Sequence, residues 1–241
     1  MFPVEFNIVY EDFSQNPYPT LSELRKKAPI SFVPQLGAIL LSKHEDIFVC
    51  EKNILVFSSV QPDGLMTKLM GQNMMRKDGK EHKNERHIIF PTVSPKTTRN
   101  VWKQKFIDQS KGILDNFSDR QEIDLVNEFA KPVSAEALKF ITGLTNMTWQ
   151  EMDRVSQGMI DGCANYAQNK LVEENCHNCT ASIDFHIQER LEQDLGSDPS
   201  LLSVFTSKKE EFETLSANVK LAISGGQNEP RDAIAGTIAT L

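Results

Sequence analysis

The chain has 241 residues, of which 39% are hydrophobic and 24% charged, and its formal net charge is −7. This is the composition of a water-soluble globular protein, and the chain has neither a run of about 18 apolar residues nor a basic start before an apolar stretch, which argues against a membrane span and a secretory signal. Four cysteines are too few for a disulfide scaffold, so we expect a cytoplasmic protein with reduced thiols.

A small β hairpin is predicted near the N-terminus, with helices around and after it. Residues 18–27 have helical spacing that ends before Pro29, residues 30–42 are apolar and β-prone on both sides of a turn, and residues 44–52 return to helical spacing. Residues 57–79 have no clear period and are expected to form a long loop. Further helices are predicted at residues 81–90, 100–118 and 132–144, from Thr148, around residues 183–191, and from Ser216 to Leu241.

Positive charge is concentrated between Arg76 and Lys111. This segment holds ten Lys or Arg residues against four acids, a net charge of +6 that leaves −13 for the rest of the chain. It indicates a local anionic ligand or an acidic protein partner, or else a solvated helix face. Few aromatic residues interleave with the basic ones, so nucleic acid is not the expected partner.

His82 and Arg86 lie four residues apart, and on a helix both side chains project from the same face. A histidine and an arginine one turn apart form a set of donors suited to a carboxylate, which arginine can bind through two parallel hydrogen bonds. The alternative is that both side chains belong to a solvated basic helix. The spacing alone leaves both interpretations open.

The residues around this pair resemble the C-helix signature of bacterial cytochromes P-450. The pattern is D-G-x-E-H-x-x-x-R followed by F-x-x-x-S-P, and its positions here are Asp78, Gly79, Glu81, His82, Arg86, Phe90, Ser94 and Pro95. N-P-Y-P at residues 16–19 and L-L-S at residues 201–203 are similar to other family segments, in family order. The resemblance implies a cytochrome P-450-like fold, with the C-helix region at residues 76–95 and with His82 and Arg86 holding a propionate of haem b.

Gly225, Gly226 and Pro230 interrupt the last predicted helix. Inside a helix each glycine costs about 1 kcal/mol and a proline about 3 kcal/mol. A helix that tolerates them is either opened for a ligand or water, or plainly kinked, or made of two short helices joined at the glycines. The sequence alone leaves these alternatives open.

The resemblance identifies residues 216–241 as part of the family's I-helix, which lies over the haem. Gly225 and Gly226 align with the first two positions of its motif, and Asn228 and Glu229 then stand where the family has an acid and an alcohol. This variant resembles a subset of bacterial members, some of which are fused to a reductase. We therefore expect the two glycines to line the haem site, and Asn228 and Glu229 to be catalytic, with Glu229 relaying protons from a buried position.

The cysteines suggest no metal ligand. Cys176 and Cys179, with His186 nearby, have the spacing of half a zinc site, but a variable surface loop is the favoured interpretation because no second pair is present. Cys50 and Cys163 lie on apolar helical stripes and are expected to be small core residues. None of the four lies in the F-x-x-G-x-x-x-C-x-G loop that carries the family's axial thiolate.

We therefore expect residues 1–241 to be the N-terminal part of a single cytochrome P-450 domain, mainly α with a small β hairpin and truncated at its C-terminus. The favoured function is that of a partial haem-thiolate monooxygenase, inactive alone, whose enzyme oxidises a C–H bond of a small organic substrate with electrons from a redox partner or a fused reductase. The alternatives are a non-catalytic truncated haem-binding protein and a helical interaction protein. Neither nucleic acid nor a membrane is an expected partner.

Overall fold

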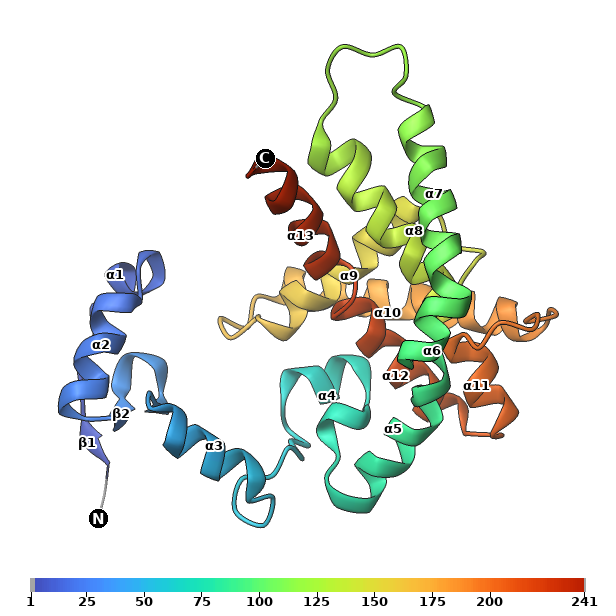
Figure 1. Cartoon of the computed structure of the whole chain (residues 1–241). Coiled ribbons are helices and arrows are strands. Elements are labelled where there is room, and N and C mark those ends of the chain that lie inside the picture. Colours follow the sequence, from blue (N-terminus) through green and yellow to red (C-terminus); the bar gives the residue numbers. More distant parts are fainter. Residues whose placement is uncertain (1–2, 241) are drawn as a thin grey trace. The chain divides into compact units, whose positions relative to one another are not determined.

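The computed structural model describes residues 3–240 and divides into two compact units, Met1–Ser59 and Val60–Leu241 (Figure 1). Met1, Phe2 and Leu241 lie outside the described residues, and Leu241 was the predicted end of the last helix. No described helix combines the length and the apolar character that a membrane span requires.

The first unit contains the predicted hairpin. Its elements are β1 (Val4–Glu5), α1 (Tyr10–Gln15), α2 (Tyr18–Lys27), β2 (Ile30–Val33), β3 (Ala38–Leu41) and α3 (His44–Lys52). β2 and β3 pair antiparallel across a 3-10 turn that ends at Gly37, whose φ of 60° favours glycine. β1 was not predicted, and it pairs parallel with β2. The helices predicted at residues 18–27 and 44–52 are confirmed at both ends.

The second unit is helical. Its elements are α4 (Leu65–Met70), η2 (Met74–Arg76), α5 (Gly79–Val93), α6 (Pro95–Thr97), η3 (Thr98–Trp102), α7 (Lys103–Asp115), η4 (Leu125–Ala130), α8 (Lys131–Thr142), α9 (Trp149–Cys163), α10 (Lys170–Leu191), α11 (Leu201–Ser207), α12 (Phe212–Ser224) and α13 (Asn228–Ala239). The predicted start of α9 is confirmed, since the hydroxyl of Thr148 accepts a hydrogen bond from the backbone N–H of Glu151 at 3.1 Å.

The predictions for residues 57–79 and for the end of α5 are wrong. The expected loop at residues 57–79 contains α4 and the 3-10 turn η2, because Leu69 and Met70 are buried in the core. A helix of six residues depends on such burial rather than on a visible period. α5 was expected to end at Phe90 but continues to Val93, with Pro91 inside it. Proline has no N–H, so the backbone carbonyl one helical turn before Pro91 lacks its usual donor. Pro91 is exposed, and water can bind that carbonyl instead.

α9 and α10 pack closely through small residues. A Cβ atom added at Gly158 would lie 2.3 Å from the sulfur of Cys179, and one added at Gly162 would lie 2.5 Å from the sulfur of Cys176. Both thiols are fully buried. The thiols of α10 therefore fill the space that the glycines of α9 leave, and the surface loop expected at Cys176 and Cys179 is wrong.

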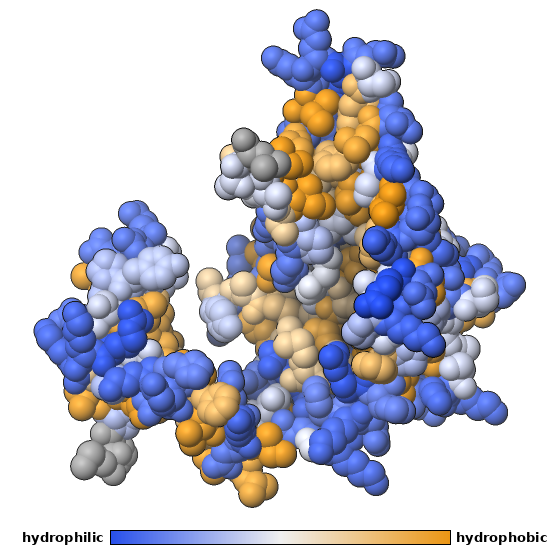
Figure 2. All heavy atoms as spheres, in the orientation of Figure 1, coloured by the Kyte–Doolittle hydropathy of each residue, from blue (hydrophilic) through white to orange (hydrophobic). Residues whose placement is uncertain are grey.

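Apolar surface remains exposed on the second unit. Figure 2 shows hydrophobic residues in its upper part, the region of α7 and α8 in Figure 1. Ile107 and Leu114 of α7 are large apolar residues that are exposed, as is Val126 of η4. Exposed apolar area of this kind commonly marks a surface that a ligand or another polypeptide segment covers.

We predict that Gly158→Ala destabilises the chain by about 1–3 kcal/mol, because the new methyl group overpacks the contact with Cys179. Urea unfolding followed by circular dichroism measures the loss. Adding Cys179→Ala to Gly158→Ala should recover part of it, since the two side chains compete for the same space.

Gly112→Ala in α7 is the matched control. No atom lies within 4 Å of a Cβ atom at Gly112, so alanine there should leave the stability unchanged or raise it by up to about 1 kcal/mol through helix propensity. A Gly158→Ala variant as stable as Gly112→Ala would contradict the close packing of α9 and α10.

Candidate functional site

α5 presents the predicted histidine and arginine beside its buried face. Glu85, Ile88, Ile89 and Thr92 of this helix are buried, whereas His82 is half-buried and Arg86 exposed. Among the ion pairs of the described residues, none involves Arg86. Farther along the helix Phe90 is 52% exposed. One side of α5 therefore offers an unpaired cation, a histidine and open apolar surface.

The imidazole of His82 is held by one ring nitrogen. Its Nδ1 lies 2.9 Å from the carbonyl oxygen of Met74 in η2. A carbonyl only accepts hydrogen bonds, so Nδ1 carries the proton and donates, and Nε2 remains for another partner. If Nε2 binds a carboxylate it must carry a proton as well, which makes His82 a cation in that state.

The basic segment is only partly available to a ligand. Lys77 forms an ion pair with the buried Glu85, and Lys105 forms one with Asp198. Arg76 differs, because its Nε is buried without a hydrogen-bond partner among the described residues. Arg76 is thus a further candidate for binding an acidic group. The sequence analysis did not single it out, because its position in the basic segment does not differ from that of the other cations there.

The predicted last helix is divided at the two glycines. α12 ends at Ser224 and α13 begins at Asn228, as Figure 1 shows. The structure therefore corresponds to the alternative of two helices joined at Gly225 and Gly226. Gly226 packs tightly, since a Cβ atom there would lie 2.5 Å from the carbonyl oxygen of Ala222. Gly225 is exposed, and the nearest atom to a Cβ atom there would be 3.5 Å away.

Side chains of α8 and α9 satisfy the backbone at this break. Ser156 of α9 donates to the carbonyl of Ile223 at 3.1 Å, and Ser134 of α8 donates to the carbonyl of Gln227 at 2.6 Å. The buried amide of Gln227 donates to a carboxylate oxygen of Asp153 at 3.2 Å. The sequence analysis missed these residues, which lie 67 to 93 positions from the groups they bind, because no local pattern links them.

An apolar cavity of about 320 Å³ lies beside Gly225. Its lining consists of Met66, Met75, Ile160, Cys163, Ala164, Tyr166, Leu221, Ser224 and Gly225. Burial raises the pKa of the Cys163 thiol, and the positive charge of Arg76 opposes this shift more weakly. The thiol therefore stays protonated near neutral pH, and no ionised side chain lines the cavity.

Asn228 and Glu229 begin α13 but differ in their surroundings. Asn228 is half-buried, and its side-chain oxygen is buried without a partner among the described residues. Glu229 is exposed, so the burial expected for its carboxylate is not present in the structure. An unpaired buried amide oxygen is costly unless a donor, such as a ligand or a water molecule, reaches it.

η2 connects the two predicted sites. The carbonyl of Met74 accepts from His82, its N–H donates to Asn218 of α12 at 3.1 Å, and the next residue, Met75, lines the cavity beside Gly225. His82 and Arg86 do not line this cavity themselves. The link between the cation pair and the helix break thus runs through a single turn of the backbone.

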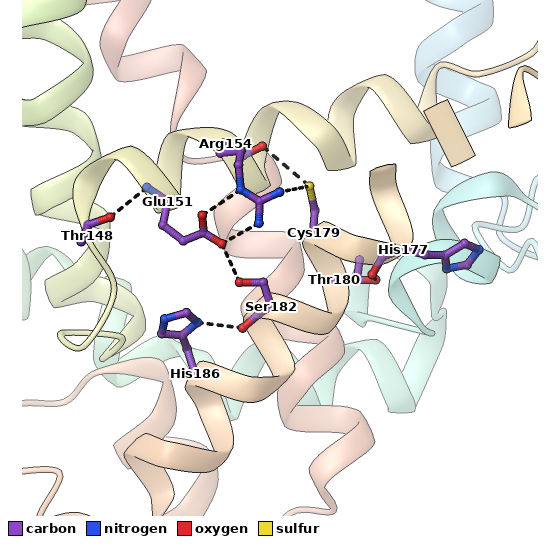
Figure 3. A network of polar contacts seen from close by, with 8 residues as sticks. All are labelled: Thr148, Glu151, Arg154, His177, Cys179, Thr180, Ser182 and His186. Atoms are coloured by element: carbon purple, nitrogen blue, oxygen red, sulfur yellow. Dashed lines mark hydrogen bonds and ion pairs between the residues drawn. The ribbon is translucent and has the colours of Figure 1, made fainter. Parts of the chain in front are cut away.

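Cys176 and Cys179 belong to the interior rather than to a metal site. Burial raises the pKa of Cys176 to about 12, and Figure 3 shows the ring of His177 pointing away from the sulfur of Cys179. That sulfur accepts a hydrogen bond from Arg154 at 3.4 Å. No group of three metal-binding side chains occurs in the part of the chain that the structure describes, so the zinc interpretation is not supported.

Arg154 also organises the polar contacts around that thiol (Figure 3). Its Nε and Nη2 atoms donate to the carboxylate of Glu151 at 2.7 and 2.6 Å, and Ser182 of α10 donates to the same carboxylate at 2.5 Å. These bonds lower the pKa of Glu151. This network joins α9 to α10 and is structural.

Comparison with solved structures identifies the fold. The chain superposes on CYP109E1 of Bacillus megaterium in complex with testosterone with a TM-score of 0.78, at 17% identity, over 96% of this chain and 61% of that one. It superposes on CalO2 with a TM-score of 0.75, at 19% identity, over 95% of this chain and 60% of that one. The chain has the fold of a cytochrome P-450.

Curated relatives support the same resemblance, although no family model matches the chain. The chain is 20% identical over 230 residues to pulcherriminic acid synthase of Bacillus subtilis, which covers 90% of this chain and 54% of the relative. It is 22% identical over 129 residues to the Bacillus subtilis protein named "Putative cytochrome P-450 YjiB", which covers 54% of this chain and 32% of that relative. The chain thus resembles bacterial cytochromes P-450, and its matches cover 54% and 32% of the length of these two curated relatives.

Proposed function

We propose that this chain supplies the propionate-binding and substrate-binding part of a haem-thiolate monooxygenase. The observation that carries the proposal is the pair His82 and Arg86 on α5, joined through Met74 to the helix that is broken at Gly225. The exposed apolar surface near α7 and α8 agrees with a chain that covers about 60% of the cytochromes P-450 it superposes on.

The side chains fit a haem with acidic arms. Arg86 is unpaired, Arg76 has a buried Nε without a partner, and His82 presents Nε2. In the proposal, His82 and Arg86 hold a propionate of haem b, and Gly225 leaves room for the ring because it has no side chain. Gly226 instead allows the close packing at the break, where a Cβ atom would collide with the carbonyl oxygen of Ala222.

The cavity beside Gly225 is the proposed substrate site. Its lining is apolar and carries no ionised side chain, so it suits a small uncharged organic molecule, and Met66 and Met75 give it an adaptable wall. When bound, a haem-thiolate group supplies the oxidising chemistry that places an oxygen atom in a C–H bond, with electrons from a redox partner or a fused reductase.

None of the four cysteines serves as the iron ligand in this proposal, and the chain alone is inactive. Cys176 and Cys179 are enclosed between α9 and α10, and Cys163 is protonated in the wall of the cavity. A thiolate-type carbonyl spectrum from this chain would contradict this part of the proposal.

Haem titration of the chain, followed by absorbance, tests the proposal. His82→Ala and Arg86→Ala should each raise the dissociation constant about ten- to a hundredfold, the loss expected for one charge-assisted hydrogen bond.

Lys83→Ala and His87→Ala are the controls, because both side chains are exposed on α5 beside the pair. They should leave the dissociation constant within about twofold. A folded chain that takes up no haem would contradict the proposal and would favour the helical interaction protein. Equal losses in all four variants would indicate only a general effect of positive charge.

Glu229 is proposed to relay protons from the first turn of α13, with the unpaired side-chain oxygen of Asn228 beside it. In a protein in which this chain is joined to the remaining part of a cytochrome P-450 fold, Glu229→Gln should lower the amount of product formed per electron pair. Asp232→Asn, which changes another exposed acid of α13, should not. Unchanged coupling in Glu229→Gln would remove Glu229 from the mechanism.

A further inference from the structure

Asn218 is a buried polar residue that the proposed mechanism does not use. It lies in α12 and is 1% exposed. A buried amide must find hydrogen-bond partners, because leaving it without them costs about 1–3 kcal/mol. Its partners therefore show what its presence in this helix achieves.

The amide of Asn218 is satisfied on both sides. Its oxygen accepts from the backbone N–H of Met74 at 3.1 Å. Its nitrogen donates to a carboxylate oxygen of Glu85 at 2.8 Å and to the carbonyl of Thr214 at 2.9 Å. The other oxygen of Glu85 is paired with Lys77. The orientation of the amide is thus fixed, since only its nitrogen can donate to the carboxylate and to the carbonyl.

This orientation determines the position of Met74. The N–H of Met74 is held by α12, and its carbonyl accepts both from the N–H of Lys77 at 3.3 Å and from Nδ1 of His82 at 2.9 Å. With both of its backbone polar groups bound, Met74 cannot turn its carbonyl away from the imidazole without losing partly buried hydrogen bonds. The proton of His82 is then kept on Nδ1, and Nε2 is left without a hydrogen-bond partner among the described residues.

We infer that Asn218 is a positioning residue for His82: through Met74 it sets the tautomer and the ring orientation of the histidine that the proposed function assigns to a haem propionate. Glu85 and Lys77 support it by fixing the amide. The inference rests on the proposed function only for what His82 binds. The tautomer itself is a property of this chain without any ligand.

The tautomer is measurable in the 241-residue chain by NMR with ¹⁵N-labelled histidine, at a pH where the imidazoles are neutral. The resonances of His82 are assigned by their loss in His82→Gln. We expect the Nδ1–H form in the unsubstituted chain, and an Nε2–H form at His82 in the unsubstituted chain would overturn the inference without any further variant. In Asn218→Leu we expect a mixture that contains the Nε2–H form, and a His82 that stays entirely Nδ1–H there would also overturn it.

One further variant separates positioning from general destabilisation. Asn146→Leu is the control, because Asn146 is half-buried and, like Asn218, donates to a backbone carbonyl, that of His186, at 3.1 Å. It should lower stability and leave His82 as Nδ1–H. A loss of the Nδ1–H form in Asn146→Leu would count against the inference.

Haem titration then separates this inference from the proposed function. With both ring nitrogens of His82 protonated, as a bond from Nε2 to a propionate requires, Asn218→Leu should weaken haem binding in the unsubstituted chain because the ring loses its fixed orientation. It should not do so in a His82→Ala background, since both changes remove the same contact. If the tautomer shifts as expected while haem binding does not depend on His82, the positioning of His82 stands and the proposed function fails. If Asn218→Leu weakens haem binding equally in both backgrounds, Asn218 does not act through His82.

Discussion

The turn at Met74–Arg76 is the constraint on which both parts of the candidate site depend. Met74 bonds to α12 through its N–H and to His82 of α5 through its carbonyl, and the neighbouring Met75 lines the cavity beside Gly225. A displacement of this short turn would therefore change the presentation of the histidine and the wall of the cavity together. Two functional features that are far apart in the sequence share one small structural element.

The break between α12 and α13 is stable because the buried backbone carbonyls beside it have hydrogen-bond partners. Ser156 and Ser134 bind the carbonyls of Ile223 and Gln227, and the amide of Gln227 reaches Asp153. Buried carbonyls without such donors would make the interruption costly. Side chains of α8 and α9 therefore stabilise the break between the two helices, and Gly225 lines the cavity.

Local sequence patterns predicted the elements whose signals are local. The turn at Gly37, the cap at Thr148 and the period of residues 18–27 were sufficient for the hairpin, the start of α9 and α2. α4 was missed because six residues carry no period and are held by tertiary burial. The hydrogen bonds of Ser134, Ser156 and Asn218 join distant parts of the chain, so no spacing rule could reveal them.

The C-x-x-C motif shows how a local pattern misleads when its partner is distant. The spacing of Cys176 and Cys179 suits a metal or a surface loop, but Gly158 and Gly162 of α9 supply the space that both thiols occupy. His82 and Arg86 differ from the two cysteines. Their spacing and the resemblance to cytochromes P-450 predicted two side chains on one helix face, and in the structure both lie on α5, with Arg86 exposed and His82 half-buried. The exposure of Glu229 was not predictable, since it depends on which segments cover α13.

Paramagnetic broadening by a bound ferric protoporphyrin tests most directly whether the cations of α5 and the break at Gly225 face one ligand. In an amide NMR spectrum of the chain, the signals of Arg86 and Gly225 should broaden together as the porphyrin is added, and that of Gly112 should stay sharp. Zinc protoporphyrin, which is diamagnetic, should broaden neither. Broadening of Arg86 with an unchanged Gly225, or the reverse, would contradict a shared haem site.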